Sequence, residues 1–99
     1  MLVNNPYLVS SYTDGASFYR IYSDGWCEQG GQTTATESNS YTVNLLVPYA
    51  SADYSVNITC LSTSNTDRGW SYAHDLATAN FKTVQTAAGA KWIAFGYIL

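Results

Sequence analysis

Residues 19–31 read YRIYSDGWCEQGG, so that Ser-Asp-Gly separates two aromatic-rich runs and a double glycine follows. The same pattern of Tyr, Ser or Thr, Asp and Gly occurs at residues 12–15 and at residues 22–25. Asp-Gly pairs favour tight turns, because glycine adopts positive φ at little cost. The two turns predict a three-stranded meander, with strands at about 6–12, 18–22 and 26–31.

Alternating apolar and polar residues predict further strands downstream. In YTVNLLVPY (41–49) and YSVNITC (54–60), every second side chain is large and apolar, which is the period of a half-buried strand. Pro48 lacks an N–H, so the first of these strands ends there or lies at a sheet edge. Shorter candidates are WSYAHD (70–75) and FKTVQ (81–85). With no amphipathic helix of useful length, the sequence predicts an all-β fold, a small antiparallel β-sandwich of about six to eight strands.

The closing segment KWIAFGYIL (91–99) is apolar on both faces after its lysine. A two-layer sandwich has one core, so we expect one of these faces to meet another copy of the chain, which predicts a homo-oligomer. The candidate interface residues are Gln29, Trp92 and Ile98. For the Gln29 segment the alternative is a strand end with a bulge, and the double glycine allows either a bulge or a close approach of the backbone.

Charged residues make up 11% of the 99 residues, with four Lys and Arg and a net charge of −3. Nucleic-acid binding needs cations that neutralise phosphates, so the composition argues against a nucleic-acid partner and against an anionic membrane surface. No apolar run approaches the ~20 residues that cross a bilayer, and no signal-peptide pattern opens the chain. We expect one domain without membrane insertion, and the chain could be a fragment of a longer protein.

Residue patterns typical of catalysis or metal binding are scarce. The single histidine, His74, precedes Asp75, and neighbours on a strand point to opposite faces, so we expect no orienting pair. Asp24 and Glu28 could form a carboxylate pair, but the turn already explains Asp24. There is no nucleophile elbow, P-loop or metal-ligand cluster, so the sequence predicts no enzyme activity, no cofactor and no metal site. The two cysteines, Cys27 and Cys60, match no zinc pattern; a disulfide is possible, and two buried free thiols are favoured.

A polar loop predicted at 62–69 is the best place for a ligand. Sugars are recognised by neutral hydrogen-bonding groups beside an aromatic platform, and binding residues concentrate on loops of a rigid scaffold. The alternative is that the aromatic residues here belong to the core, and that the histidine is a surface or interface residue. The candidate glycan-binding residues are Asn65, Asp67, Arg68, Trp70, Tyr72 and His74.

Several of these segments together resemble the C-terminal receptor-binding domain of bacteriophage tail-fibre proteins. The resemblance is carried by an aromatic-Arg-apolar-aromatic run, a Trp strand that ends in Gln-Gly-Gly, a Pro-aromatic corner, a Tyr-x-Val strand and a final Trp-x-x-x-Gly element. These lie at residues 19–22, 26–31, 48–49, 54–56 and 92–96. The pattern is also similar to H-type lectins, which are trimeric sandwiches that bind sugars. The motifs are structural, so they indicate the fold better than the ligand.

The resemblance implies a homotrimer at the tip of a virion tail fibre, assembled in the host cytoplasm. Its implied partners are identical copies and a bacterial surface receptor, either a glycan or an outer-membrane protein. Residues 17–99 would form the tip domain, and residues 1–16 would connect it to an upstream shaft. Two alternatives remain open: a trimerisation and folding cap that binds no receptor, and a free carbohydrate-binding lectin.

Overall fold

The computed structural model describes residues 5–33, 40–61, 72–84 and 89–99. Within these residues the chain forms strands only, arranged in two antiparallel sheets. The predicted all-β sandwich is confirmed, and the eight described strands match the upper end of the predicted range of about six to eight. The eight strands are β1 (Leu8–Asp14), β2 (Ser17–Tyr22), β3 (Trp26–Gln32), β4 (Ser40–Asn44), β5 (Ser55–Cys60), β6 (Tyr72–His74), β7 (Asn80–Val84) and β8 (Ala90–Tyr97).

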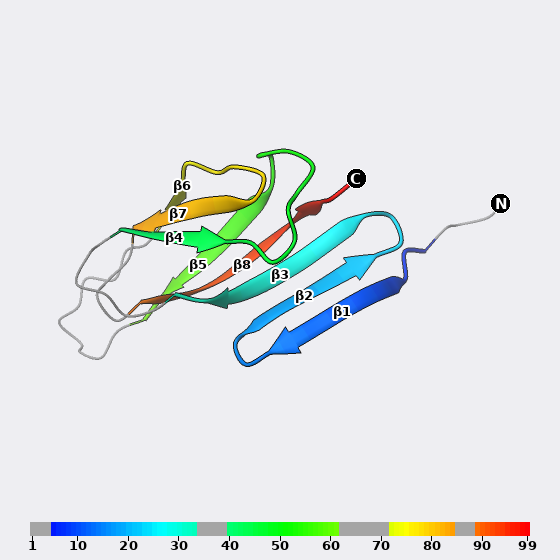
Figure 1. The fold of residues 1–99 in the computed structure, drawn as a ribbon, viewed down its shortest axis with the longest axis horizontal. Helices are drawn as coiled ribbons and strands as arrows, with labels where there is room; N and C mark the ends of the chain where they lie inside the picture. Colours follow the sequence, from blue (N-terminus) through cyan, green and yellow to red (C-terminus); the bar gives the residue numbers. More distant parts are fainter. Residues whose placement is uncertain (1–4, 34–39, 62–71, 85–88) are drawn as a thin grey trace.

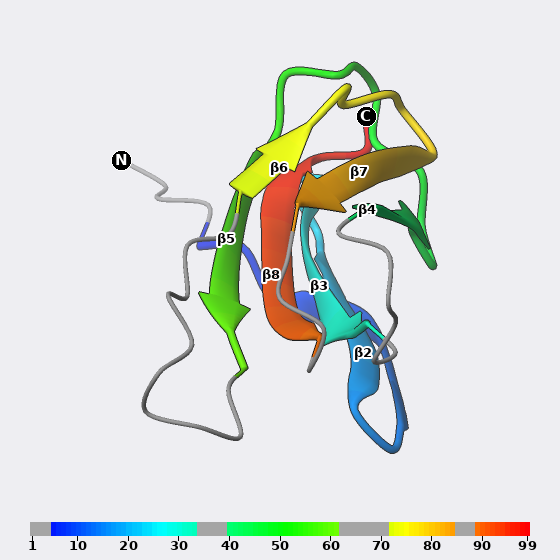
Figure 2. The ribbon, with the colours of Figure 1, turned by 90° about the vertical axis from the view of Figure 1, so that its left-hand side faces the viewer.

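The larger sheet has the order β1-β2-β3-β8-β5, and the smaller sheet has the order β4-β7-β6. Figure 1 shows the smaller sheet on one side of the molecule, while β1 and β2 lie at the opposite side. In the turned view of Figure 2, the arrow of β7 ends beside the upper end of β8. The strand that closes the described chain, β8, therefore sits inside the larger sheet, between β3 and β5.

The N-terminal meander forms as the sequence predicts. Strand β1 pairs with β2, and β2 pairs with β3. The two turn glycines, Gly15 and Gly25, have φ values of 62° and 88°, the left-handed region that glycine enters cheaply. At the second turn Asp24 Oδ1 accepts a hydrogen bond of 3.0 Å from the Trp26 N–H. Strand β1 forms the outer strand of the larger sheet; the division into a connector at 1–16 and a tip domain at 17–99 stays a prediction.

Segment 41–49 keeps the predicted alternation of burial but leaves the strand early. Val43 and Tyr49 are buried, whereas the even-numbered positions between them are exposed. The pairing of β4 with β7 ends at Asn44, because the following backbone amides donate to groups outside this strand pair. The Leu45 N–H donates to the Ala79 carbonyl, and the Tyr49 N–H donates to the Thr78 carbonyl.

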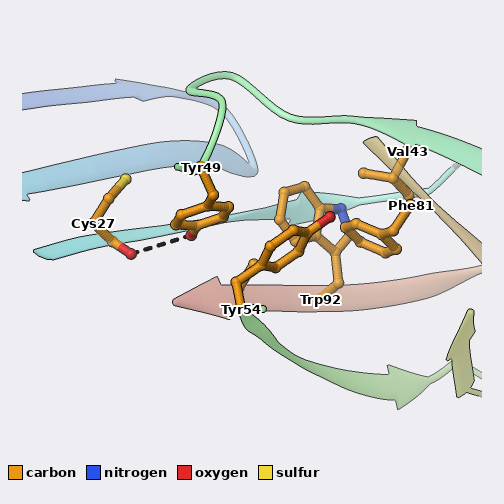
Figure 3. Close-up of a cluster of buried hydrophobic side chains, with 7 residues drawn as sticks. Cys27, Val43, Tyr49, Tyr54, Phe81 and Trp92 are labelled. Atoms are coloured by element: carbon orange, nitrogen blue, oxygen red, sulfur yellow. Dashed lines mark hydrogen bonds between the residues drawn. The ribbon is translucent and has the colours of Figure 1, made fainter. Parts of the chain in front are cut away.

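The core lies between the sheets and is rich in aromatic rings (Figure 3). Phe81 of the smaller sheet meets Trp92 of the larger sheet edge to face, with ring centroids 5.3 Å apart. Tyr49 stacks on Tyr54 at 4.5 Å, near the end of the sandwich where segment 45–54 crosses between the sheets. The buried hydrophobic cluster consists of Cys27, Val43, Tyr49, Tyr54, Phe81, Trp92 and Ala94.

The double glycine of β3 permits close packing rather than a bulge. The pairing of β3 with β8 runs without a register shift from Trp26 to Gln32. A Cβ added to Gly30 would lie 2.5 Å from the Phe18 ring and 2.7 Å from the Trp92 carbonyl oxygen. The bulge expected at this position is therefore wrong.

Candidate binding surface

Most of the predicted glycan-binding loop lies outside the described residues. This applies to Asn65, Asp67, Arg68 and Trp70, whose role stays a prediction. The other two candidates, Tyr72 and His74, lie on β6 with ring centroids 5.9 Å apart. Tyr72 is 48% exposed, so it is not the core residue that the alternative interpretation made it.

The side chains of His74 and Asp75 lie close together, although neighbouring positions on a strand predict opposite faces. His74 Nδ1 lies 3.3 Å from Asp75 Oδ2, and Lys82 Nζ lies 4.0 Å from the same oxygen. The prediction of no local pair is wrong, because β6 ends at His74 and Asp75 has a φ of 51°. All three side chains are at least partly exposed, so the ion pairs contribute little to stability.

Two of the three candidate interface residues lie inside the single chain. Gln29 has no exposed surface, and Trp92 is 8% exposed and packs on Phe81. Ile98 is half-buried against the core, and its N–H donates to the Gly25 carbonyl. Gln29 and Trp92 are thus buried within the single chain, whereas a role of Ile98 in a contact with another copy stays a prediction.

Gln29 binds a segment of its own chain. Its Nε2 donates to the Val47 carbonyl at 2.7 Å, and its Oε1 accepts from the Leu46 N–H at 2.9 Å and from the Val47 N–H at 3.1 Å. A glutamine side chain carries both donors and an acceptor, so it can bind the Leu46 and Val47 amides and the Val47 carbonyl, which lie outside the strand ladder. The partners of this candidate interface residue are therefore backbone groups of its own chain.

The outer face of the larger sheet carries an aromatic cluster at one end. Trp26 lies directly opposite Tyr97 in the pairing of β3 with β8, and their ring centroids are 5.1 Å apart at 74°. Phe95, two residues earlier on the same face, lies 6.0 Å from Trp26. Tyr97 is 52% exposed. The face that the core does not use is therefore apolar, as the sequence predicted for the last strand.

A hollow of about 420 Å³ lies beside this cluster. Its aromatic side includes Trp26 and Tyr97, and its polar side includes Ser51, Asp53 and Ser55. Ser55 is the cross-strand partner of Phe95, so β5 and β8 together place these groups on one face.

Segment 50–53 forms the polar wall of this hollow. The Ala50 N–H donates to the Tyr97 carbonyl at 3.0 Å, which ties the segment to the end of β8. The Asp53 N–H donates to Ser51 Oγ at 3.1 Å, a local turn of the kind that serine favours. The exposed Asp53 side chain is thereby held on a short, anchored loop beside the aromatic rings.

Trp26 also lines a smaller hollow of about 300 Å³, together with Tyr22, Asp24 and Glu28. The two carboxylates considered as a catalytic pair thus lie near one indole ring. Glu28 faces Arg20 in the pairing of β2 with β3, and the Arg20 guanidinium lies 5.5 Å from the Phe18 ring centroid. The described charges around Trp26 are therefore mainly negative.

A groove of about 570 Å³ separates β5 from β6, the edge strands of the two sheets. It is lined mostly by apolar side chains that also border the core. Its lining comprises Val56, Asn57, Ile58, Tyr72, Ala73 and Leu76.

The hairpin of β1 and β2 carries several exposed apolar side chains. Every residue of β1 is exposed, including Leu8 at 48% and Val9 at 53%. Tyr12 stacks on Tyr19 with centroids 5.5 Å apart, and its hydroxyl donates to Asp14 Oδ2 at 3.2 Å. The charge of Asp14 raises the pKa of Tyr12, which keeps the tyrosine neutral.

The buried titratable groups have their pKa values shifted toward the neutral state. Burial raises the pKa of Tyr49, whose hydroxyl donates to the Cys27 carbonyl at 3.1 Å. Burial also raises the pKa of Tyr54 and of the free Cys27 thiol. Such groups stabilise a core rather than act as nucleophiles. Among the described residues, no three His, Cys, Asp or Glu side chains are grouped to hold a metal ion.

Trp26, Tyr97 and Asp53 were not singled out as site residues from the sequence. The alternation of the last strand placed Tyr97 on the second apolar face, but the pairing of β3 with β8 across some seventy residues carries no local signal. Asp53 lies between the strands predicted at 41–49 and 54–60, and nothing in the sequence indicates that this connection returns to the end of β8.

Comparison with solved structures finds the same fold in tail fibres. A C-terminal fragment of the R2 pyocin fibre of Pseudomonas aeruginosa matches with a TM-score of 0.71 and 19% identity, over 89% of this chain and 26% of that chain. An N-truncated R2-type pyocin tail fibre matches with a TM-score of 0.63 and 22% identity, over 89% and 38%. No family model and no curated protein matches the sequence. The chain has the fold of part of these fibres and spans well under half of either fragment; its likeness to H-type lectins stays a prediction.

The described residues include no helix that is long and apolar enough to span a membrane.

Proposed function

We propose that this chain is a domain of a virion tail fibre, assembled in the host cytoplasm, that adheres to a receptor on a bacterial surface. The observation that carries the proposal is the match of 89% of the chain to two pyocin tail fibres. Low charge, abundant neutral polar residues and exposed aromatic rings support an adhesive rather than an enzymatic role. The receptor is a surface glycan or an outer-membrane protein.

The proposal includes a homotrimer, with the contact moved from the buried Gln29 and Trp92 to the β1–β2 hairpin. Leu8, Val9 and Tyr12 are between 41% and 53% exposed on an edge strand. Exposed apolar residues on an unpaired edge favour association with another chain. We expect a second copy of the chain to pack against this edge, because a fibre consists of identical chains packed side by side.

A trimerisation and folding cap without receptor binding is the second candidate. The same exposed hairpin favours it, since this feature concerns assembly and not adhesion. A free lectin would bind sugars in the same way but would need no fibre. The two main candidates differ in whether the isolated domain adheres to cells.

Adhesion is tested with fluorescently labelled domain on whole bacteria and on a glycan array. Binding to cells or glycans supports the adhesin, whereas a stable trimer that binds neither supports the cap.

Assembly is tested by light scattering. A trimer has three times the 10.8 kDa mass of the chain, and Leu8→Ser with Val9→Ser should yield monomer. The matched control is Leu46→Ser, at a side chain that is 45% exposed on the loop after β4. If the hairpin variant stays trimeric while Ile93→Ser dissociates, the contact lies on the outer face of β8 instead.

A further inference from the structure

We infer that the hollow between Trp26, Tyr97 and Asp53 binds a neutral or amino-bearing sugar ring. The inference rests on the proposed adhesive function and gives that function a site and a ligand class. It concerns residues other than the loop candidates at 65–74.

The first step is the aromatic platform. Trp26 and Tyr97 lie opposite each other on adjacent strands, with centroids 5.1 Å apart and planes at 74°. Rings in this arrangement offer two apolar surfaces to a ligand, and the Phe95 ring, which also lines the hollow, lies 6.0 Å from the indole. The apolar C–H face of a pyranose packs on such rings, because aromatic side chains offer a large apolar area at low cost in conformational entropy.

The second step is the polar wall. The hollow of about 420 Å³ is lined on its other side by Ser51, Asp53 and Ser55, and it falls within the usual size of about 300–1,000 Å³ for small-ligand sites. Carboxylate and hydroxyl oxygens accept hydrogen bonds from sugar hydroxyls. Segment 50–53 is anchored by the Ala50 hydrogen bond to β8, so the wall is preformed.

The third step is charge. Asp53 lines this hollow, and Asp24 and Glu28 line the smaller hollow that Trp26 also lines. Of the described cations, Lys82 lies on β7 of the smaller sheet beside Asp75, and Lys91 lies six residues from Tyr97 along β8, about 20 Å away. Arg20 lies opposite Glu28 and over the Phe18 ring. The local field therefore disfavours uronic acids, sialic acids and phosphorylated sugars, and it favours neutral sugars or amino sugars.

The test is an NMR titration of the full chain that follows the Trp26 indole N–H, which is assigned by its loss in Trp26→Phe. The probes are the methyl glycoside of N-acetylglucosamine, which is neutral, glucosamine, which is cationic, and galacturonic acid, which is anionic. We expect saturable shifts of the Trp26 signal with the first two probes, and at least about tenfold weaker binding of the third.

Two variants and one matched control locate the site. Tyr97→Ala should weaken binding of both active probes at least about tenfold, and Asp53→Asn should weaken binding of glucosamine more than binding of the neutral glycoside. Leu46→Ala removes an apolar side chain of comparable exposure, 45% against 52%, from the loop after β4 and should change nothing, whereas Tyr72→Ala tests the loop candidates. Circular dichroism checks that each variant is folded.

Four outcomes would overturn the inference. They are no shift with any probe, stronger binding of galacturonic acid than of glucosamine, loss of binding in Tyr72→Ala but not in Tyr97→Ala, and a reduced oligomer mass in Tyr97→Ala with no sugar binding in the parent chain. The last would show that a second copy covers the hollow.

Whole-cell adsorption separates this inference from the proposed function. If the parent chain and Tyr97→Ala adsorb equally well, the site is wrong and the adhesive function stands. If Trp26 responds to sugars but the parent chain adsorbs to no bacterium, the site stands and the adhesive function fails.

Discussion

Gln29 and Val47 hold each other by hydrogen bonds in both directions, although they are eighteen residues apart. The amide nitrogen of Gln29 donates to the Val47 carbonyl at 2.7 Å, and its amide oxygen accepts from the Val47 N–H at 3.1 Å. Gln29 has no exposed surface, so water cannot replace it. This one side chain fixes the path by which the chain crosses from the smaller sheet toward β5.

Gln29→Leu should destabilise the fold by about 3 kcal/mol or more. Leucine has a similar volume but no amide, so the Leu46 N–H and the Val47 N–H and carbonyl lose their partner. Each such loss costs about 1–3 kcal/mol. Urea unfolding measures the loss. The control is Gln32→Leu, at an exposed position at the end of the same strand, where a change below about 0.5 kcal/mol is expected. Equal effects of the two substitutions would contradict the role of Gln29.

Alkaline pH should destabilise the protein through its buried tyrosines. Burial raises the pKa of Tyr49 and of Tyr54 above the ordinary value of 10.0. The folded state therefore holds these protons more tightly than the unfolded chain. The resulting stability is complete below pH 10 and is lost as the pH rises through the raised values.

Urea unfolding at about pH 8 and about pH 11 measures this dependence. Tyr49→Phe should flatten it. A parent protein with the same free energy of unfolding at both pH values would contradict the assignment.

Gly30→Ala should cost about 1–3 kcal/mol, the range for overpacking a tight contact. The new methyl group would meet the Phe18 ring at 2.5 Å and the Trp92 carbonyl oxygen at 2.7 Å. Gly15→Ala is the comparison, because a Cβ there meets nothing within 4 Å and only the positive φ opposes it, at about 1–2 kcal/mol. Thermal unfolding and the near-ultraviolet circular dichroism of Trp92 separate the two, since only Gly30→Ala should disturb the environment of that ring.

Cys27 should be unreactive in the folded protein. Its side chain is fully buried and free, and burial raises the pKa of its thiol, which removes the reactive thiolate. In a Cys60→Ser background, a thiol reagent such as a disulfide-exchange dye should label the protein only after urea unfolds it. Rapid labelling without denaturant would show that the core opens near Tyr49.

The strands of this protein were predictable because they carry local signals. The two Asp-Gly turns fixed the meander, and the alternation in 41–49 and 54–60 identified the faces that turn inward. The pairing of β8 with β3 and β5 was not predictable, because it joins segments far apart in the chain and depends on packing. For the same reason the sequence placed Gln29 and Trp92 at a subunit contact, when their partners Val47 and Phe81 lie in the same chain. The meeting of Trp26, Tyr97 and Asp53 depends on that long-range pairing as well.

The central place of β8 has a consequence for biosynthesis. As the chain leaves the ribosome, the meander and β5 emerge first, but no strand yet joins them into one sheet. The larger sheet can close only after β8 has cleared the exit tunnel, so the nascent chain remains exposed to chaperones and proteases until that moment.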